Sequence, residues 1–264
     1  MMPPRVIVTR PAHEAERWVR DLRARAWAAQ ALPLIAILPV SDETALQQAR
    51  ARLGDYQAVM FVSGNAVRYF LAGLPSAAWR DVQTRAWATG PGTVRALTDL
   101  GWPRARVDAP DAAAGGQADS EALWTCVAAQ IKPGARVLLV RGADATGCPV
   151  GRSWLTDHLT AAGAQIQTVA AYRRVPPVWD AEQQQCARAA VRDGSVWIIS
   201  SSEAAAHLRE IACAAQPALD LHSARAVATH PRIARAARAA GFGAVAEADG
   251  PTLEAVIRSI ESFA

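Results

Sequence analysis

Lysine is nearly absent from this sequence, because Lys132 is the one lysine among 28 basic Lys and Arg residues. It stands in an Ile-Lys-Pro-Gly turn ahead of an expected strand, a position that argues against a Schiff-base or phosphate-loop lysine. Arginine therefore carries the basic charge, and its planar fork suits carboxylates and phosphates. A base-composition bias toward Arg and Ala explains the same excess, and we give that explanation the greater weight for the net charge of +4.

Cysteine is also scarce, and neither the cysteines nor the five histidines show metal-ligand spacing. We expect free thiols in a reducing compartment and no metal site. No apolar run approaches the roughly 20 residues that a membrane-spanning helix needs, and no signal-peptide segment follows Met1. The expected location is therefore the cytoplasm, away from any membrane. The cysteines are Cys126, Cys148, Cys186 and Cys213.

Apolar segments that end abruptly in small polar residues organise the chain. Residues 59–62 stop at Ser63 before a helical pattern, and residues 196–199 stop at Ser200 in the same manner. At the carboxyl ends of strands in an open parallel sheet, backbone N–H groups and hydroxyls face the ligand crevice. These two corners are therefore where we expect a ligand.

The two corners belong to a longer internal repeat. Residues 136–142 correspond to 5–11, Ser200 to Ser63, and 225–231 to 85–91, with offsets of 131, 137 and 140 residues. Alternating strands and helices require parallel strands, right-handed crossovers and helices on both faces of a sheet. The sequence predicts an α/β protein with two doubly wound parallel-sheet lobes, formed by tandem duplication, and a site between them.

Small hydrogen-bond donors recur at the predicted strand ends. Each one alone is best interpreted as a helix cap, and Thr93 is expected to cap a helix over 94–100. Together, at equivalent points of a repeat, they indicate a binding site for a small polyanion. No G-x-S-x-G surrounds the serines, so caps are favoured over nucleophiles. The candidate ligand-binding residues are Thr9, Arg10, Ser63, Asn65, Gly90, Thr93, Arg141, Gly142, Ser200, Ser201 and Thr229.

Tyr172 ends the predicted strand over 165–172, ahead of a proline-containing connection. There its phenol could donate a proton to a leaving hydroxyl or orient it. A tyrosine at such a position is more often a packing residue with a hydrated hydroxyl, and the residues alone favour that second interpretation. Elsewhere, residues 112–117 are expected to form a loop, and Asp119 to cap the helix that follows.

Taken together, these segments resemble the uroporphyrinogen-III synthase family over nearly the whole chain. Their order and spacing carry the resemblance rather than any single segment. Val62 departs from the family pattern, in which Thr is common before the serine, and the loop over 143–150 is long. The matching segments are 8–11, 61–67, 88–93, 119–123, 140–142, 151–152, 169–172, 198–201 and 227–233.

The resemblance implies a carbon–oxygen lyase of haem biosynthesis that closes linear hydroxymethylbilane to uroporphyrinogen III. The substrate would lose its hydroxyl to give an azafulvene, and its last pyrrole ring would be inverted through a spiro intermediate, with no cofactor or metal. Tyr172 matches the family tyrosine proposed to assist departure of the hydroxyl. The implied binding positions are Ser63, Asn65, Gly90, Thr93, Ser200, Ser201 and Thr229.

The resemblance also implies a swapped arrangement. Residues 1–37 and 175–264 would form one lobe, residues 42–170 the other, and 38–41 with 171–174 two connecting strands. A monomer is expected that receives its tetrapyrrole substrate from hydroxymethylbilane synthase. One alternative is a non-catalytic two-lobed binder of a small polyanion, which only turnover would distinguish. Another is a nucleic-acid-binding protein, which we disfavour because the arginines are dispersed along the sequence and no recognition motif is present.

Overall fold

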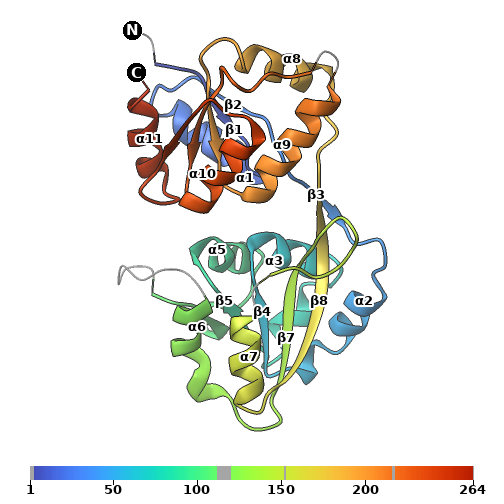
Figure 1. Cartoon of the computed structure of the whole chain (residues 1–264). Coiled ribbons are helices and arrows are strands. Elements are labelled where there is room, and N and C mark those ends of the chain that lie inside the picture. Colours follow the sequence, from blue (N-terminus) through green and yellow to red (C-terminus); the bar gives the residue numbers. More distant parts are fainter. Residues whose placement is uncertain (1–2, 112–119, 152, 216–217, 264) are drawn as a thin grey trace. The chain divides into compact units, whose positions relative to one another are not determined.

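The structure is a computed structural model that describes residues 3–111, 120–151, 153–215 and 218–263. It divides into two compact units: unit 1 is Met1–Ala36 with Val175–Ala264, and unit 2 is Ile37–Arg174. Each unit is an α/β domain built on its own sheet (Figure 1). The loop predicted over 112–117, the cap predicted at Asp119 and Arg152 of the family pattern lie outside the described residues.

Unit 1 is built on a sheet of five strands: β1 (Val6–Val8), β2 (Ala29–Ala31), β9 (Val196–Ile199), β10 (Arg225–Ala228) and β11 (Ala244–Glu247). Their order is β11-β10-β9-β1-β2, and every neighbouring pair is parallel. The β-branched residues of β1 are completely buried, as a central strand covered on both faces requires.

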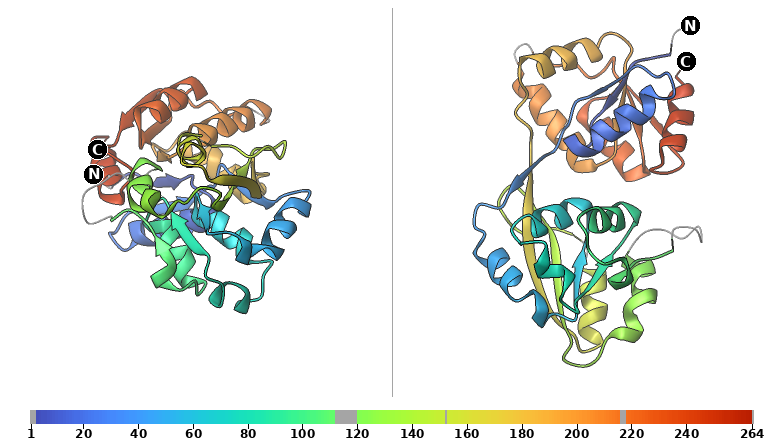
Figure 2. Two further views of the ribbon diagram at one scale, coloured as in Figure 1. Left: turned by 90° about the horizontal axis from the view of Figure 1, so that it is seen from below. Right: turned by 180° about the vertical axis from the view of Figure 1, so that it is seen from behind.

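Helices cover both faces of this sheet: α1 (Ala12–Arg23), α8 (Ala181–Ala190), α9 (Ser202–Ala214), α10 (Pro231–Ala240) and α11 (Leu253–Glu261). Helices α9 and α10 lie on the face turned toward the viewer in Figure 1, and α1 is in front in the rear view of Figure 2. Helices α1 and α11 share one core, in which Trp18 and Leu22 pack with Val256 and Ile260.

Unit 2 is built on a sheet of six strands: β3 (Ala36–Pro39), β4 (Ala58–Phe61), β5 (Arg85–Ala88), β6 (Val107–Asp108), β7 (Arg136–Ala143) and β8 (Gln165–Val175). Their order is β3-β8-β7-β4-β5-β6, and the pairs from β8 to β6 are parallel. The chain passes between the two units within β3 and within β8. Pro39 ends β3 at the sheet edge, where a residue without an N–H is tolerated.

The helices of unit 2 are α2 (Thr44–Ala51), α3 (Gly64–Leu71), α4 (Ala77–Arg80), α5 (Pro91–Asp99), α6 (Ser120–Val127) and α7 (Trp154–Ala161). Short 3-10 turns occupy Leu53–Asp55, Arg104–Arg106 and Ala128–Gln130. One core packs α2, α3 and α5 against the sheet, and a second packs α6 and α7 against it. We call the two sides of the sheet the α3–α5 face and the α6–α7 face.

The two sheets have the same connectivity, which confirms the internal repeat. The order β10-β9-β1-β2 in unit 1 matches β5-β4-β7-β8 in unit 2, and the N-terminal strands complete the sheet of the C-terminal half. By the offset of 131, Val6 of β1 corresponds to Val137 of β7. Val6 pairs with Val196 and Val137 pairs with Ala58, so Ala58 corresponds to Val196 and the offset from β4 to β9 is 138 residues (58 to 196). The predicted offset of 137 at this corner is therefore wrong by one residue.

Two further local predictions are wrong. Thr93 does not cap a helix, because α5 begins at Pro91 with Gly90 as its N-cap, and proline is favoured at the first helical position. Tyr172 does not end its strand, because β8 continues to Val175. The strand continues because its backbone still finds partners beyond Tyr172, with Arg173 opposite Ala143 of β7.

Candidate functional site

The structure brings Tyr172 of β8 together with Ser63, which follows β4. Their hydroxyl oxygens are 3.1 Å apart, and either one can be the donor. The Ser63 hydroxyl also accepts from the Ala66 N–H at 3.1 Å and so caps helix α3, the role predicted for it. A buried phenol is therefore hydrogen-bonded directly to the N-terminus of a helix at the carboxyl edge of the sheet.

A β-bulge sets the direction of the Tyr172 side chain. Arg141 is opposite Ala170, but Gly142 is opposite Tyr172, so Ala171 is an extra residue in β8. Side chains in a regular strand alternate between the two faces, whereas here Ala171 and Tyr172 both join the core on the α3–α5 face. The bulge thereby turns the tyrosine toward Ser63, and only 4% of the Tyr172 surface remains exposed.

Two neighbours fix the Tyr172 ring. The ring of Tyr69 lies 5.8 Å from it, centre to centre, and the Tyr69 hydroxyl donates to the Ile37 carbonyl at 2.9 Å. Gly142 supplies the other wall, because a Cβ added there would come within 2.7 Å of the ring. The phenol is therefore held in one position by packing as well as by its hydrogen bond.

Two helix N-termini lie side by side next to Ser63. A Cβ added to Gly64, the first residue of α3, would be 3.6 Å from the Gly92 carbonyl oxygen in the first turn of α5. The first-turn N–H groups and the positive ends of both helix dipoles therefore gather here, an arrangement that favours anions. Asn65 and Gly90 are half-buried at these two N-termini, whereas the Thr93 side chain is buried inside α5.

Arg141 lines a separate pocket of unit 2, on the α6–α7 face, with a cavity volume of about 210 Å³. Its guanidinium lies against Gly151, where an added Cβ would be 2.9 Å from Nη2. Burial lowers the pKa of Arg141, because a low-dielectric surrounding disfavours the charged form. Of the predicted residues, only Arg141 lines this pocket.

The predicted residues of unit 1 are engaged in the fold of that unit. The buried Thr9 hydroxyl donates to the Ile198 carbonyl at 2.6 Å. Ser201 caps α9 by accepting from the Glu203 and Ala204 N–H groups, while Ser200 is half-buried beside it. Thr229 is buried at the end of β10.

Arg10 is held by its own unit. It forms an ion pair with Glu14 at 3.2 Å, and its guanidinium carbon lies 4.2 Å from the centre of the Trp18 ring. Burial lowers the pKa of Arg10, and the Glu14 carboxylate opposes this shift. By the repeat offset of 131, Arg10 corresponds to Arg141 of unit 2.

A family model described as uroporphyrinogen-III synthase HemD matches residues 16–258 of this chain. The chain belongs to the uroporphyrinogen-III synthase family. This confirms the family assignment made from the sequence, with the α/β fold of two parallel sheets and the prediction of a cyclising lyase of tetrapyrrole biosynthesis. A non-catalytic binder is the less supported alternative.

Similar proteins agree with membership in the uroporphyrinogen-III synthase family. The uroporphyrinogen-III synthase of Salmonella typhimurium LT2 is 26% identical over 266 residues, covering 97% of this chain and 99% of the relative. That of Chlorobaculum parvum is 33% identical over 100 residues, covering 36% of this chain and 39% of the relative. The crystal structure of uroporphyrinogen-III synthetase from Helicobacter pylori 26695 shares the fold, with a TM-score of 0.62, 17% identity and full coverage of both chains.

The sequence reasoning missed several residues around these family positions. Thr89, Ser120 and Thr156 line the Arg141 pocket, and Tyr69 supports Tyr172. The repeat carried a signal for Thr89, since the offset of 140 pairs it with the predicted Thr229. Ser120 lies in the family-matched segment 119–123. No comparable signal marks Tyr69 or Thr156, because they come from helices that only the folded chain brings to the strand ends.

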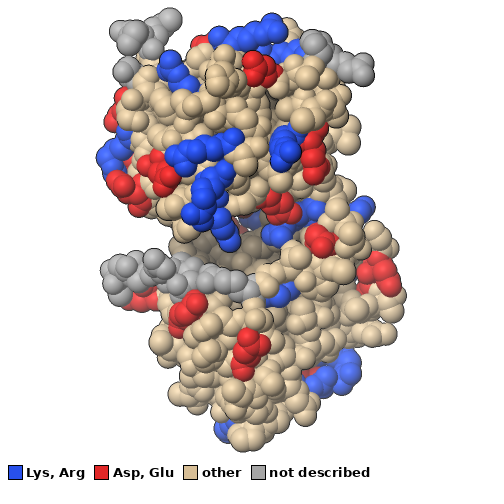
Figure 3. All heavy atoms as spheres, viewed as in Figure 1, with Lys and Arg blue, Asp and Glu red and all other residues tan. Residues whose placement is uncertain are grey.

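Arginine is locally clustered, contrary to the dispersed pattern predicted. Figure 3 shows basic side chains gathered on the face of unit 1 where Figure 1 places α10. Helix α10 carries the exposed Arg232, Arg235 and Arg238 at intervals of three residues.

In the described part of the chain, no group of three or more His, Cys, Asp or Glu is placed to hold a metal ion. Among the described helices, none is long and apolar enough to cross a bilayer.

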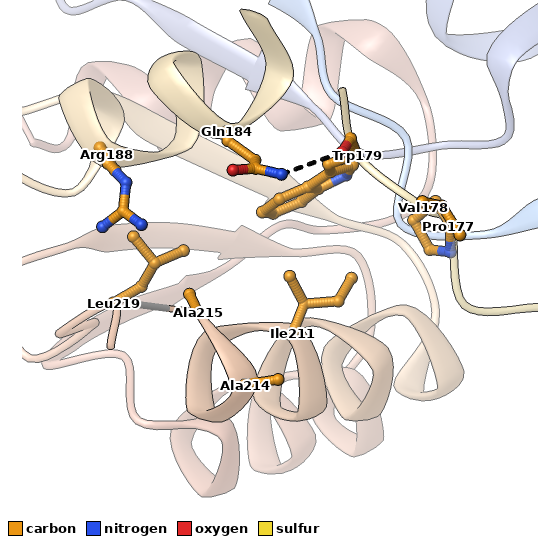
Figure 4. Close-up of a pocket in the computed structure, with 9 residues that line it drawn as sticks. All are labelled: Pro177, Val178, Trp179, Gln184, Arg188, Ile211, Ala214, Ala215 and Leu219. Carbon is orange, nitrogen blue, oxygen red and sulfur yellow. Dashed lines mark hydrogen bonds between the residues drawn. The ribbon is translucent and has the colours of Figure 1, made fainter. Parts of the chain in front are cut away.

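A cavity of unit 1, about 470 Å³, contains none of the predicted residues. Its wall includes the Trp179 indole, Ile211 and Leu219, with Arg188 at one end (Figure 4). The Gln184 side chain donates to the Trp179 carbonyl at 3.1 Å and stiffens this wall. No residue of the family resemblance lines this cavity.

Proposed function

We propose that this chain closes hydroxymethylbilane to uroporphyrinogen III, with inversion of the last pyrrole ring and loss of water. Family membership supports the reaction, and the observation that carries the chemistry is the hydrogen-bonded pair of Tyr172 and Ser63. The pair offers one O–H donor in a site that largely excludes water, which is what a departing hydroxyl needs.

In this proposal Tyr172 is the catalytic residue. As the C–O bond of the hydroxymethyl group breaks, the phenol donates its proton and the hydroxyl leaves as water. The azafulvene accepts the electron pair of the last ring at its substituted α-carbon, which forms the spiro intermediate. The bond from that carbon to its original methylene bridge then breaks, and the freed bridge closes onto the other α-carbon of the same ring. The proton lost from that carbon as the ring regains aromaticity returns to the phenolate. Ser63 holds the phenol and, because its hydroxyl both donates and accepts, stabilises either protonation state. The remaining catalytic task is to position the linear substrate for ring closure.

The substrate carries several carboxylates, and the structure also offers groups that can bind them. The adjoining N-termini of α3 and α5 offer N–H groups beside Ser63, Asn65 and Gly90. The other proposed contacts are residues of unit 1, namely Thr9, Arg10, Ser200, Ser201 and Thr229. The proposal further includes a cytoplasmic monomer, free of any cofactor, that receives substrate from hydroxymethylbilane synthase, with 38–41 and 171–174 as connecting strands.

The test is a coupled assay. Hydroxymethylbilane is generated in situ, the products are oxidised to porphyrins, and the type I and type III isomers are separated by chromatography. The expected result is a shift from type I to type III on addition of the protein. Type I alone, from protein shown to be folded by circular dichroism, would overturn the proposal and favour a non-catalytic polyanion binder.

A further inference from the structure

We propose that Arg232 and Arg235 of α10 bind neighbouring carboxylates of the linear substrate and draw it to unit 1, an inference that rests on the proposed function. We call these two residues the α10 row. Both side chains are exposed on the helix over which Figure 3 shows basic side chains gathered. The row belongs to unit 1 alone, whereas the pair of Tyr172 and Ser63 belongs to unit 2.

Helix α10 starts at the carboxyl edge of the unit 1 sheet. It begins at Pro231, shortly after the end of β10, so Arg232 lies in its first turn, and Arg235 follows about 4.5 Å further along the helix axis. Ligands of open parallel sheets bind at this edge, where the proposed contact Thr229 also lies. The Arg232 N–H donates to Nδ1 of His230 at 3.1 Å. The guanidinium groups, rather than the first-turn N–H groups, are therefore the proposed ligand-binding groups.

The charges of the row are unfavourable for the helix that carries them. The amino end of a helix is the positive end of its dipole, so the Arg232 charge in the first turn is opposed by it, and the first turn of α10 has no acidic residue. Arg235 adds a second positive charge three residues later, where like charges repel. Among the described residues, neither guanidinium forms an ion pair with a carboxylate. A bound anion would supply the compensation that the protein does not.

Arg238, one step further along α10, differs in this respect. Its guanidinium pairs with the Glu247 carboxylate at 3.4 Å and donates to the Val245 carbonyl at 3.2 Å. These contacts attach α10 to the edge strand β11 of its own sheet. Arg238 therefore has a structural role, and we do not include it in the row.

The internal repeat shows that the fold does not require the row. Helices α5 and α10 both begin with a proline, and their strands β5 and β10 are related by an offset of 140 residues (85 to 225). By this offset Arg232 corresponds to Gly92 and Arg235 to Arg95. The same helix therefore forms in unit 2 with no charge at the first of the two positions, and two successive arginines are particular to unit 1.

The row fits neighbouring carboxylates. The planar fork of each arginine can donate two parallel N–H bonds to the two oxygens of one carboxylate. Two forks that start about 4.5 Å apart along the helix can reach the acetate and propionate arms of a single pyrrole ring. Exposed charges also speed the association of an oppositely charged ligand. Phosphates of a nucleic acid would suit the same forks, and the experiment separates the two ligands.

The experiment measures kcat and KM of purified variants with freshly prepared hydroxymethylbilane. In the double variant Arg232→Gln/Arg235→Gln we expect kcat/KM to fall about fivefold or more at about 0.01 M salt, while kcat stays within about twofold. Between about 0.01 M and about 1 M salt the Debye length falls from about 30 Å to about 3 Å, so wild type and variant should converge. Arg232→Lys/Arg235→Lys keeps both charges and should retain most of the wild-type kcat/KM at low salt.

The matched control is Arg20→Gln. Arg20 is an exposed arginine in the last turn of α1, a helix on the other face of the same sheet (Figure 2). Its replacement also removes one positive charge from unit 1, and it should leave kcat and KM unchanged. Thermal melting of the double glutamine variant should show no loss of stability, because the removed charges oppose the helix dipole.

Titration with uroporphyrin III, followed by quenching of tryptophan fluorescence, gives a readout that needs no turnover. At low salt the double glutamine variant should bind it about fivefold more weakly than wild type and Arg20→Gln. Equal binding and equal kcat/KM in wild type and the double variant, or a loss that persists at about 1 M salt, would overturn the inference. So would a DNA oligonucleotide that binds only the wild type while kcat/KM is unchanged. A wild type that makes no type III isomer defeats the proposed function instead, and the titration then tests the row by itself.

Discussion

Gly142 and Tyr172 are packed so closely that no side chain can stand between them. A Cβ on Gly142 would lie 2.7 Å from two carbon atoms of the Tyr172 ring and 2.9 Å from its hydroxyl oxygen. The two residues face each other across the β7–β8 pair, next to the bulge that turns the tyrosine. The phenol can occupy its observed position only because residue 142 is a glycine, which has no Cβ.

Gly142→Ala should displace the phenol. The added Cβ would clash with the Tyr172 ring inside a packed core. We therefore expect a loss of about 1–3 kcal/mol in the free energy of unfolding and a clear fall in kcat. Urea unfolding and the isomer assay measure the two effects. Gly54→Ala is the matched control, because its Cβ would meet only Val82 Cγ1 at 3.7 Å, an ordinary contact, and Gly54 lies outside the proposed site. A Gly142→Ala protein as stable and active as the wild type would contradict the packing argument.

Tyr172→Phe should cost more activity than any other substitution in the proposed site. Phenylalanine keeps the contacts with Tyr69 and Gly142 but removes the proposed proton donor, so kcat should fall about a hundredfold while stability changes by about 1 kcal/mol. Ser63→Ala loses the α3 cap and should reduce stability by a similar amount or slightly more, with a smaller effect on kcat. We expect no single substitution to abolish the reaction. A complete loss from a site variant other than one at Tyr172, or a Tyr172→Phe rate within twofold of wild type, would refute this assignment.

Neighbouring serines in unit 1 test the corrected repeat. Ser201 caps α9, so Ser201→Ala should lower the free energy of unfolding by about 1 kcal/mol. Ser200→Ala, one residue earlier, should change it by less than about 0.5 kcal/mol because that hydroxyl caps nothing in the described helix start. Chemical denaturation of the two variants gives the comparison. Equal losses would mean that the register places the cap incorrectly.

The four thiols should react in two groups. Cys126, Cys148 and Cys213 are exposed, whereas Cys186 is buried, and burial raises the pKa of its thiol. An aromatic disulfide reagent should therefore modify three thiols quickly in the native protein and the fourth only after unfolding or at higher pH. Cys186→Ser should remove only the slow phase. Four equal rates would contradict the burial of Cys186.

The same shift predicts the direction of a pH effect on stability. Because the folded thiol keeps its proton at a pH where the unfolded thiol has lost it, the unfolded state binds fewer protons. The contribution of Cys186 is complete below the ordinary thiol pKa of about 8.5, and it is lost as the pH rises through the raised value. Wild type should therefore lose more stability than Cys186→Ser between about pH 8 and the raised pKa.

The sequence was sufficient for features that repeat or alternate. The buried strands beginning at Val6 and Ala58, the caps at Ser63 and Ser201, and the duplicated connectivity follow from apolar runs that end in small polar residues. The correspondence of Ser63 with Ser201 did not follow, because a one-residue shift leaves the residue types similar. Only hydrogen-bond register distinguishes the two serines.

The site was less predictable than the fold. Tyr172 was named from its place in the chain, but its partner and direction depend on the extra residue Ala171, and a bulge leaves no mark in a run such as Val-Ala-Ala-Tyr. Thr93 was expected as a cap, although Pro91 nearby favoured an earlier start of the helix. Ser120 and Thr156 line the same pocket as Arg141 through tertiary structure alone.

The swapped arrangement has a consequence for the order in which the nascent chain folds. Unit 2 is one uninterrupted stretch, whereas β1 must wait for β9, which enters the sequence 190 residues later (6 to 196). At the usual speed of translation this is a delay of about 10 to 40 s. During that time the completely buried residues Val6, Ile7 and Val8 have no final neighbour on one side. On the ribosome, the inserted domain can therefore fold first, while the segment made earliest is the one that must be kept from aggregating.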